Sequence, residues 1–335
     1  IHSGFQSAGQ RCSALRVLYV QEEIADDLID MLIGAMKELT IGDPTQLATD
    51  VGPVIDEKAL KSLTDHQKYM EDKGTLLYRN EMPAGFDNGT FFTPTLYEIK
   101  NIDVLEKEVF GPVVHIVRFK SKELDSVLDQ INGTGYGLTM GIHSRIEERA
   151  NELAAKSRAG NVYINRNMIG AIVGVQPFGG RGLSGTGPKA GGPNYLPRLM
   201  MERATPKPSH IDDVDGTDAA LVGDEKIAER AHVMMDKAKA VEAKWRHMPL
   251  NDRISMVRQL LAKIAKVDIV DELADDLNRT LATARQQLTS VERKLAKPQV
   301  LPGPTGESNK LYLEPRGILV CFADKEVTFE YWLLS

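Results

Sequence analysis

Cysteine is scarce in this 335-residue sequence, which contains only Cys12 and Cys321. The two lie near opposite ends of the sequence, so a disulfide framework is not expected, and two isolated thiols fit a reducing compartment. The seven histidines show no pairing with cysteine at the spacing of metal ligands. These absences argue against a disulfide-stapled secreted domain and predict a cytoplasmic protein without a structural metal.

Long apolar runs and basic clusters are also missing. No apolar run approaches the length that crosses a bilayer, and the start lacks the basic-then-apolar pattern of a signal peptide. The formal net charge of −6 offers no basic surface for DNA or RNA. A hydrophobic content of 42% and a charged content of 26% are typical of a soluble globular protein. We therefore expect no transmembrane segment and no nucleic-acid partner.

Both ends of the sequence look cut. The first residue is Ile1 rather than methionine, and residues 332–335 end inside an apolar stretch. Natural termini are more often polar and frayed. We therefore expect a piece of a longer polypeptide.

Strand and helix patterns alternate along the first half of the chain. Apolar residues at helical spacing predict helices over residues 22–39, 59–74 and 123–131, and a capping-box spacing predicts another that begins at residues 144–147 and ends near residue 159. The predicted strands are residues 15–20, 75–78, 91–97, 113–119 and 162–164. This alternation predicts an α/β fold with crossover connections.

A glycine-rich stretch at residues 170–193 interrupts the alternation. It contains GRGLSG at 180–185, which matches the dinucleotide fingerprint GxGxxG literally. No strand precedes this match, and the glycines and prolines that follow do not allow a helix. We interpret the stretch as a loop that wraps a substrate, with a plain surface loop as the alternative.

The composition changes after residue 204. Residues 205–223 carry prolines and an acidic cluster and are predicted to be a linker between domains. Helices are predicted over residues 224–243, 252–266 and 269–295, followed by a turn-rich break at 298–308 and a β segment at 311–320. We therefore expect domains at residues 1–204 and 224–335.

Cys12 is a candidate nucleophile. It lies among small and polar residues, and Arg11 directly precedes it. Small neighbours admit a substrate carbon, and a nearby guanidinium or backbone N–H group favours the reactive thiolate. The alternative is a small buried hydrophobic residue with no chemistry.

Four segments resemble motifs of the aldehyde dehydrogenase superfamily and occur in that superfamily's order. They are GQRC at residues 9–12, EVFGP at 108–112, GNVYIN at 160–165 and QPFGG at 176–180. Residues 165–180 and Ser13 are similar to the anchor loop and cysteine motif of L-glutamate-γ-semialdehyde dehydrogenases, including the dehydrogenase module of the proline utilization A family. The resemblance implies an open, twisted, mostly parallel sheet with flanking helices.

The same resemblance implies a reaction and its residues. Cys12 would attack an aldehyde and pass through a thiohemiacetal and a thioester, with NAD as the cofactor and L-glutamate as the product in proline catabolism. Glu108 and Phe110 would bind NAD. The substrate, a small aldehyde that carries an α-amino acid group, would contact Ser13, Phe178 and the backbone N–H groups of Gly170 and Ala171. The resemblance also implies a homo-oligomer at full length.

The chain departs from the family in what it lacks. It contains no N-terminal NAD-binding domain, and therefore neither the general-base glutamate nor the oxyanion asparagine of such enzymes. No proline dehydrogenase domain, which would bind FAD, is present. We expect the isolated chain to bind NAD poorly and not to turn over aldehyde.

Residues 224–335 resemble a degenerate, truncated start of an aldehyde dehydrogenase. The relevant segments are AKW at 243–245 with Pro249 and Arg253, and EPRGILV at 314–320. Residues 322–326 depart from the pattern of active enzymes, so we assign Cys321 no catalytic role. Two alternatives to the proposed reaction stay open: an inactive structural or interaction module, and a dehydrogenase of another aldehyde.

Overall fold

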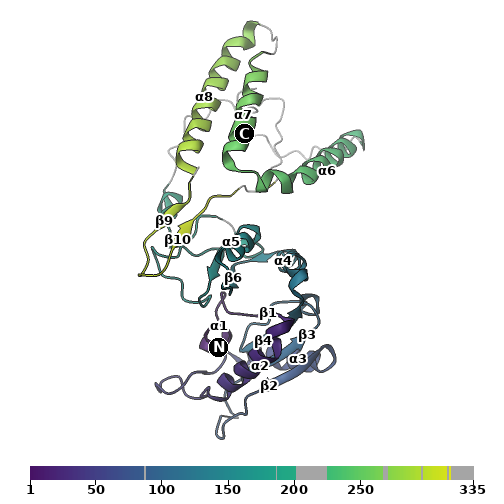
Figure 1. The fold of residues 1–335 in the computed structure, drawn as a ribbon, viewed down its shortest axis with the longest axis vertical. Coiled ribbons are helices and arrows are strands. Elements are labelled where there is room, and N and C mark those ends of the chain that lie inside the picture. Colours follow the sequence, from purple (N-terminus) through teal and green to yellow (C-terminus); the bar gives the residue numbers. More distant parts are fainter. Residues whose placement is uncertain are drawn as a thin grey trace, which may run out of the picture. The chain divides into compact units, whose positions relative to one another are not determined.

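The computed structural model describes residues 1–86, 88–185, 187–200, 225–266, 271–295, 297–314 and 317. The chain divides into two compact units, Ile1–Met201 and Glu202–Ser335 (Figure 1). Each unit is described by itself. The predicted linker at 205–223, Cys321 and half of the predicted β segment at 311–320 lie outside the described residues.

A four-stranded sheet with the order β1-β4-β3-β2 organises the first unit. Its strands are β1 (Val17–Gln21), β2 (Gly74–Arg79), β3 (Thr95–Ile99) and β4 (Val113–Phe119). Strands β1 and β3 both run parallel to β4, so that Val17 and Tyr97 flank His115, whereas β2 is antiparallel to β3. The predicted mostly parallel sheet is confirmed.

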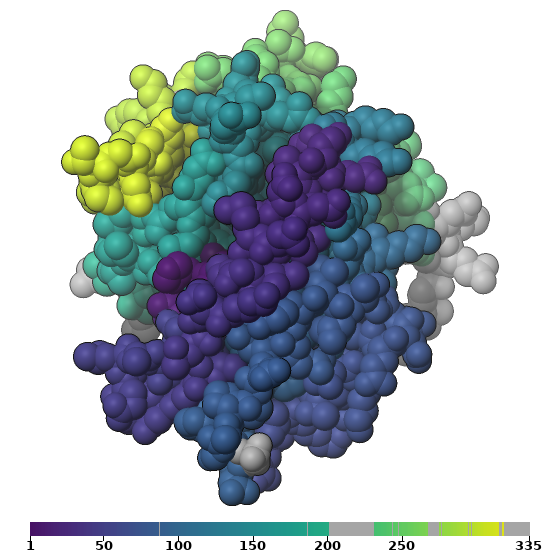
Figure 2. Space-filling view, turned by 60° about the horizontal axis from the view of Figure 1, so that its bottom comes forward, coloured from purple at the N-terminus to yellow at the C-terminus, as the bar shows by residue number. Residues whose placement is uncertain are grey.

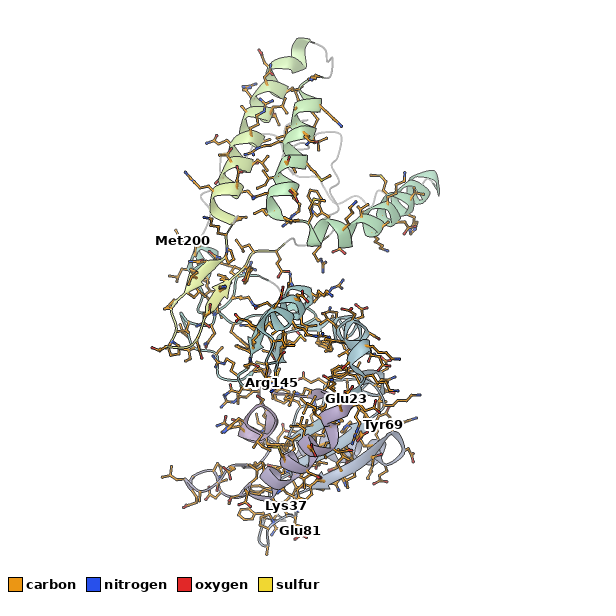
Figure 3. The ribbon with its side chains drawn as sticks, in the orientation of Figure 1. Glu23, Lys37, Tyr69, Glu81, Arg145 and Met200 are labelled. Atoms are coloured by element: carbon orange, nitrogen blue, oxygen red, sulfur yellow. The ribbon has the colours of Figure 1, made fainter. Side chains whose placement is uncertain are left out.

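Two amphipathic helices pack on this sheet. Helix α2 (Glu22–Lys37) contacts β1 and β4, and α3 (Glu57–Lys73) contacts β2. Glu23 and Lys37 lie at the two ends of α2 (Figure 3), where their charges complement the helix dipole. In the space-filling view, the purple and indigo atoms of the first fifty residues lie on the surface beside the blue atoms that follow them in the chain (Figure 2). The buried core beneath includes Ile29, Met36, Leu63, Met70, Leu96, Val113 and Ile116.

The rest of the first unit consists of short elements. These are α1 (His2–Phe5), the 3₁₀ turns η1 (Gln6–Gly9), η2 (Ile102–Val104), η3 (Ser121–Glu123) and η4 (Leu196–Leu199), the helices α4 (Leu124–Gly133) and α5 (Glu147–Lys156), and the strands β5 (Tyr136–Gly137), β6 (Thr139–Ile142), β7 (Asn161–Ile164) and β8 (Arg181–Gly182). Strand β6 runs parallel to β7, and β5 is antiparallel to β8. The glycine-rich loop thus contributes only the two-residue strand β8 and no following α-helix among its described residues, which agrees with rejecting the dinucleotide fingerprint.

The predicted capping box at residues 144–147 is wrong. Helix α5 begins at Glu147, its N-cap is Ile146, and no side chain caps it. The backbone of Ser144 is bound instead by the side chain of Asn165, which accepts from its N–H and donates to its carbonyl, both at 2.9 Å. Because Asn165 fixes Ser144 outside the helix, the serine hydroxyl accepts from the Ile146 N–H at 3.1 Å.

The second unit is mainly helical in its described residues. It contains α6 (Glu225–His247), α7 (Leu250–Ile264) and α8 (Asp271–Leu295), followed by an antiparallel pair, β9 (Gln299–Leu301) and β10 (Asn309–Leu311). Helices α7 and α8 pack together through buried Leu261, Leu277 and Leu281. Strand β9 lies inside the stretch expected to be only turns. The identity of this unit as a degenerate aldehyde dehydrogenase domain stays a prediction.

A completely buried histidine and a half-buried one form a pair in the first unit. Their Nε2 atoms are 2.9 Å apart, with His66 on α3 and His115 on β4. His115 is completely buried, its ring stacks on Tyr97, and its Nδ1 lies 3.1 Å from the Arg16 carbonyl oxygen. Since a carbonyl only accepts, Nδ1 carries the proton and His115 Nε2 accepts from His66. The His115 ring is therefore neutral, and burial lowers the pKa of His66 to about 4, so that ring is neutral at pH 7 as well.

This pair is expected to make the unit less stable in acid. Burial lowers the pKa of His66 and of His115 from 6.5 to about 4. Between these pH values the unfolded chain binds protons that the folded chain does not, so stability falls as the pH falls from 6.5 toward 4. For fully buried His115 the difference corresponds to about 3 kcal/mol.

Urea unfolding of the chain at pH 7 and at pH 4.5 measures the effect. His115→Phe should unfold with a smaller loss of stability between the two pH values than the parent chain. His143→Gln, at an exposed position, is the matched control and should keep the parent's loss. Equal losses in all three proteins would contradict the assignment of neutral rings.

Candidate active site

Cys12 follows a backbone segment with an unusual conformation. Ser7, Ala8 and Gly9 have φ angles of 56°, 53° and 63°, three consecutive residues in the left-handed region. For a residue other than glycine this conformation costs roughly 1–2 kcal/mol, and such strain tends to occur at functional sites. We call residues 6–14 the cysteine loop. Cys12 itself is exposed at the end of this strained segment, as a nucleophile must be.

The cysteine loop touches residues 108–112, which we call the EVFGP segment. A Cβ atom on Gly9 would lie 2.1 Å from the carbonyl oxygen of Gly111, so only glycine permits this approach. Two motifs that are about a hundred residues apart in sequence therefore meet backbone to backbone. The contact places Cys12 and Glu108 on neighbouring segments.

Two arginines near Cys12 in the sequence, Arg11 and Arg16, have different partners in the fold. Arg11 directs Nε to the hydroxyl of Ser7 at 3.1 Å. Arg16, four residues after Cys12, instead interacts electrostatically with Cys12 and forms an ion pair with Glu108, Nε to Oε1 at 3.1 Å. Sequence reasoning missed Arg16, because its partners come from the fold rather than from its neighbours in the chain.

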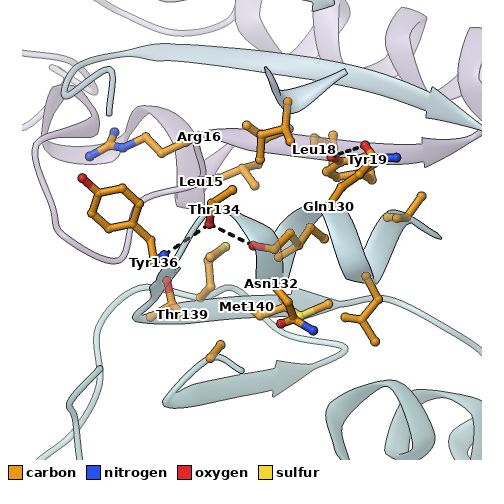
Figure 4. Close-up of a pocket in the computed structure, with 18 of the residues that line it drawn as sticks. Leu15, Arg16, Leu18, Tyr19, Gln130, Asn132, Thr134, Tyr136, Thr139 and Met140 are labelled. Carbon is orange, nitrogen blue, oxygen red and sulfur yellow. Dashed lines mark hydrogen bonds between the residues drawn. The ribbon is translucent and has the colours of Figure 1, made fainter. Parts of the chain in front are cut away.

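Cys12, Arg16 and Glu108 line one cavity of about 1280 Å³ in the first unit. The cavity extends between β1, α4 and β6 (Figure 4), where Tyr19 donates to Gln130 at 3.2 Å. Burial raises the pKa of Tyr19 to about 12, so its phenol stays protonated at neutral pH.

The loop that follows β7 is bound tightly to that strand. The side chain of Asn161 donates to the Pro177 carbonyl at 2.7 Å and accepts from the Gly179 N–H at 3.1 Å. Lys189 donates to the Gly179 carbonyl at 2.8 Å and to the Asn161 amide oxygen at 3.0 Å. We call the Asn161 and Lys189 side chains the clamp. The sequence analysis did not identify it, because its only sign in the sequence is the polar residue Asn161 near the start of the GNVYIN motif. The clamp holds half-buried Phe178 in place.

The predicted substrate-binding residues occupy different settings. Gly170 is exposed with a φ of 76°, and in the described part of the chain no group accepts a hydrogen bond from the N–H of Gly170 or Ala171. The Met168 N–H donates to the Ser3 hydroxyl at 3.2 Å, which links this turn to helix α1 before the cysteine loop. Ser13 is buried, with 6% of its surface exposed.

The cavity lining therefore includes only some of the predicted site residues. Cys12 and Glu108 belong to it. The others do not, and their roles stay predictions: Ser13, Phe110, Gly170, Ala171 and Phe178.

The residues present fit a nicotinamide cofactor on one side. The Glu108 side chain is 45% exposed and keeps one carboxylate oxygen open, which suits ribose hydroxyl donors. Phe110 is also exposed, at 43%, and offers a flat apolar face. Within the described residues, no group of three or more metal-ligating side chains occurs, and no helix is long and apolar enough to cross a membrane.

Sequence similarity to PutA extends over both units, and the likeness to solved structures covers about three fifths of the chain. Over 329 residues, 97% of this chain, the sequence is 42% identical to the bifunctional protein PutA of Klebsiella aerogenes, of which it spans 22%. A PutA structure from Bradyrhizobium japonicum is 52% identical, with a TM-score of 0.57 over 59% of this chain and 20% of that one. A 1-pyrroline-5-carboxylate dehydrogenase from Thermus with bound NAD is 32% identical, with a TM-score of 0.55 over 60% of this chain and 38% of that one.

Residues 1–205, more than half of the chain, match the aldehyde dehydrogenase family. The match includes the cysteine loop, the EVFGP segment and the loop after β7. The fold of the first unit, the contact between the two motifs and these similarities lead to one conclusion. The chain belongs to the aldehyde dehydrogenase family.

Proposed function

We propose that this chain supplies the cysteine-bearing part of an NAD-dependent dehydrogenase that oxidises L-glutamate γ-semialdehyde to L-glutamate in proline catabolism. One observation carries the proposal: exposed Cys12 shares a cavity with Glu108 because the cysteine loop and the EVFGP segment meet at Gly9. The names of the similar proteins, PutA and 1-pyrroline-5-carboxylate dehydrogenase, support the substrate. The chain spans only about a fifth of the curated PutA relative, so the reaction belongs to the longer protein.

The chemistry assigned to this chain centres on sulfur. The Cys12 thiolate attacks the aldehyde carbon, and the new carbon–sulfur bond converts the carbonyl into a thiohemiacetal oxyanion. NAD, when bound, supplies the hydride acceptor for the oxidation. Water then cleaves the resulting Cys12 thioester, which releases L-glutamate and restores the thiol. Glu108 and Phe110 hold the cofactor beside the sulfur.

The substrate's α-carboxylate is assigned to neutral donors. The N–H groups of Gly170 and Ala171, which have no acceptor in the part of the chain that the structure describes, suit an anion, because backbone donors make strong hydrogen bonds to a carboxylate and glycine lets it come close. Ser13 is proposed as a further donor, and Phe178 as the residue that flanks the aliphatic part. The clamp of Asn161 and Lys189 would keep Phe178 in position.

The finer features of the protein are proposals as well. We assign residues 1–204 to the catalytic domain, 205–223 to a linker and 224–335 to a degenerate aldehyde-dehydrogenase-like domain. We further propose a cytoplasmic homo-oligomer at full length. The scarcity of cysteine supports the location, and the similarity to PutA across both units supports the domain assignment.

A segment exchange tests the function. In the fusion, this chain replaces the matching segment of Klebsiella aerogenes PutA, and NADH formation is followed with L-glutamate γ-semialdehyde. Turnover by the fusion and none by the isolated chain is the expected result. If the folded fusion oxidises only other aldehydes, L-glutamate γ-semialdehyde is not the substrate and the chain belongs to a dehydrogenase of another aldehyde. If it oxidises no aldehyde, the result favours a structural or interaction module.

Ser13→Ala in the fusion tests the substrate assignment. Loss of a hydrogen bond to a charged group costs about 1.5–3 kcal/mol, so KM for L-glutamate γ-semialdehyde should rise roughly 10- to 100-fold. KM for a neutral aldehyde of similar length should change less than about twofold, because it has no carboxylate to bind. Equal increases for both aldehydes would contradict a carboxylate-binding role for Ser13.

A further inference from the structure

Arg16 joins the cysteine loop to the EVFGP segment. Its guanidinium donates to the Gly9 carbonyl at 2.6 Å and to the Arg11 carbonyl at 3.0 Å on one side. On the other side it donates to the Gly111 carbonyl at 3.4 Å and to Glu108 Oε1 at 3.1 Å. One side chain therefore binds both segments at once.

The position of Arg16 is itself well fixed. Its carbonyl accepts from the His115 N–H at 3.0 Å, which ties the residue to strand β4. Its side chain is only 16% exposed, whereas that of Glu108 is 45% exposed. The rigid, planar guanidinium presents five donors in a fork, a geometry that the single ammonium of lysine does not reproduce. The Arg16 guanidinium is thus largely shielded from solvent, whereas the Glu108 carboxylate that it binds is partly exposed.

Arg16 also orients the second residue assigned to the cofactor. Its guanidinium carbon lies 4.7 Å from the centroid of the Phe110 ring, a cation–π contact. In the described part of the chain, no other group donates to the Glu108 carboxylate, so Arg16 alone sets its direction. The carboxylate and the ring thus take their positions from the same side chain.

The charge of Arg16 matters in addition to its shape. Burial lowers the pKa of Arg16, while the charges of Glu108 and Cys12 oppose that change. A partly buried cation is favourable only where negative groups compensate its lost hydration. The cation therefore interacts with the sulfur of Cys12 as well as with Glu108.

We infer that Arg16 is a positioning residue that sets Glu108 and Phe110 relative to the cysteine loop, so that the cofactor-binding groups and the nucleophile keep a fixed spacing. Its kinetic consequence rests on the proposed function, and its effect on the Cys12 thiol does not. Arg16 acts on NAD through Glu108, and on Cys12 through the two loop carbonyls that it binds.

Alkylation of Cys12 tests the inference on the full chain without any turnover. The rate of iodoacetamide labelling is measured by mass spectrometry of the peptide that contains Cys12. Arg16→Met should change the labelling rate of Cys12, because the Gly9 and Arg11 carbonyls of the cysteine loop lose the side chain that binds them. The matched control is Arg118→Met, which removes an arginine of strand β4 that pairs with Asp26 of helix α2 and Glu98 of strand β3, and it should leave the rate unchanged.

Steady-state kinetics of the fusion test the positioning role. Arg16→Lys keeps the charge but not the fork, so KM for NAD should rise roughly tenfold while KM for the aldehyde stays within about twofold. Adding Arg16→Lys to Glu108→Gln should raise KM for NAD by less than it does in the parent, since the ion pair is already lost and only the contact with Phe110 remains to be removed. A purely structural role would instead lower the stability and leave both KM values unchanged, and that result overturns the inference.

The outcomes separate this inference from the proposed function. If the fusion oxidises no aldehyde, the proposed function is wrong. The alkylation rates of the isolated chain then test by themselves whether Arg16 positions the cysteine loop. Should Arg16→Met fail to unfold cooperatively, Arg16→Lys replaces it. That variant keeps a cation but not the fork that binds the Gly9 and Arg11 carbonyls together, so it should also change the labelling rate, and an unchanged rate overturns the inference.

Discussion

Replacing Cys12 by alanine in the fusion is expected to lower kcat for L-glutamate γ-semialdehyde by at least about 10³-fold. Removal of a covalent nucleophile eliminates the reaction path itself, and what remains is the effect of binding alone. The loss should appear in NADH formation under saturating substrate. It should also abolish the covalent acyl-enzyme that denaturing mass spectrometry detects in the parent, an adduct on the peptide containing Cys12.

The control for this experiment is the other cysteine. Cys321→Ala should leave kcat within about twofold, since we assign that residue no catalytic role. A Cys12→Ala fusion with more than a tenth of the parent's kcat would contradict the role of Cys12. It would also remove the chemical reason for the strained backbone at Ser7 and Ala8.

Gly9→Ala is expected to destabilise the first unit by roughly 3 kcal/mol. The substitution forces alanine into the left-handed region, which costs about 1–2 kcal/mol, and its Cβ would lie 2.1 Å from the Gly111 carbonyl oxygen. That oxygen belongs to the backbone, so the cysteine loop and the EVFGP segment must move apart. Urea unfolding of the chain measures the stability.

Gly34→Ala is the matched control for this substitution. Gly34 lies in the exposed part of helix α2, and nothing lies within 4 Å of a Cβ placed there. Alanine should therefore stabilise the helix by about 0.5–1 kcal/mol. If Gly9→Ala proves as harmless as Gly34→Ala, the close approach of the two segments is not a feature of the protein in solution.

The sequence by itself determined the class of the fold and the elements with strong local patterns. Strand β4 has the bounds that the alternation of residues 113–119 predicts, and helix α2 begins at the predicted Glu22. These elements are readable because their apolar residues recur with the period of a strand or a helix. The motifs in their order likewise identified the family, because the resemblance needs residue types and not their contacts.

Other elements could not be predicted from the local spacing of apolar and polar residues. Strand β6 contains a glycine and only four residues, and it exists because β7 pairs with it. The start of α5 is displaced by Asn165, a residue that lies after the helix in the chain. In both cases a partner far along the sequence decides the local structure.

The same division holds for the candidate site. The sequence located Cys12 and Glu108 as separate candidates, but only the tertiary structure placed them on one cavity and bound them through Arg16. The arginine next to the cysteine in sequence contacts Ser7, while the one that the fold supplies reaches the EVFGP segment. Periodicity and residue type are local properties that a sequence carries directly. Which polar groups meet across about a hundred residues depends on how strands β1 and β4 pair, and that is decided only when the chain folds.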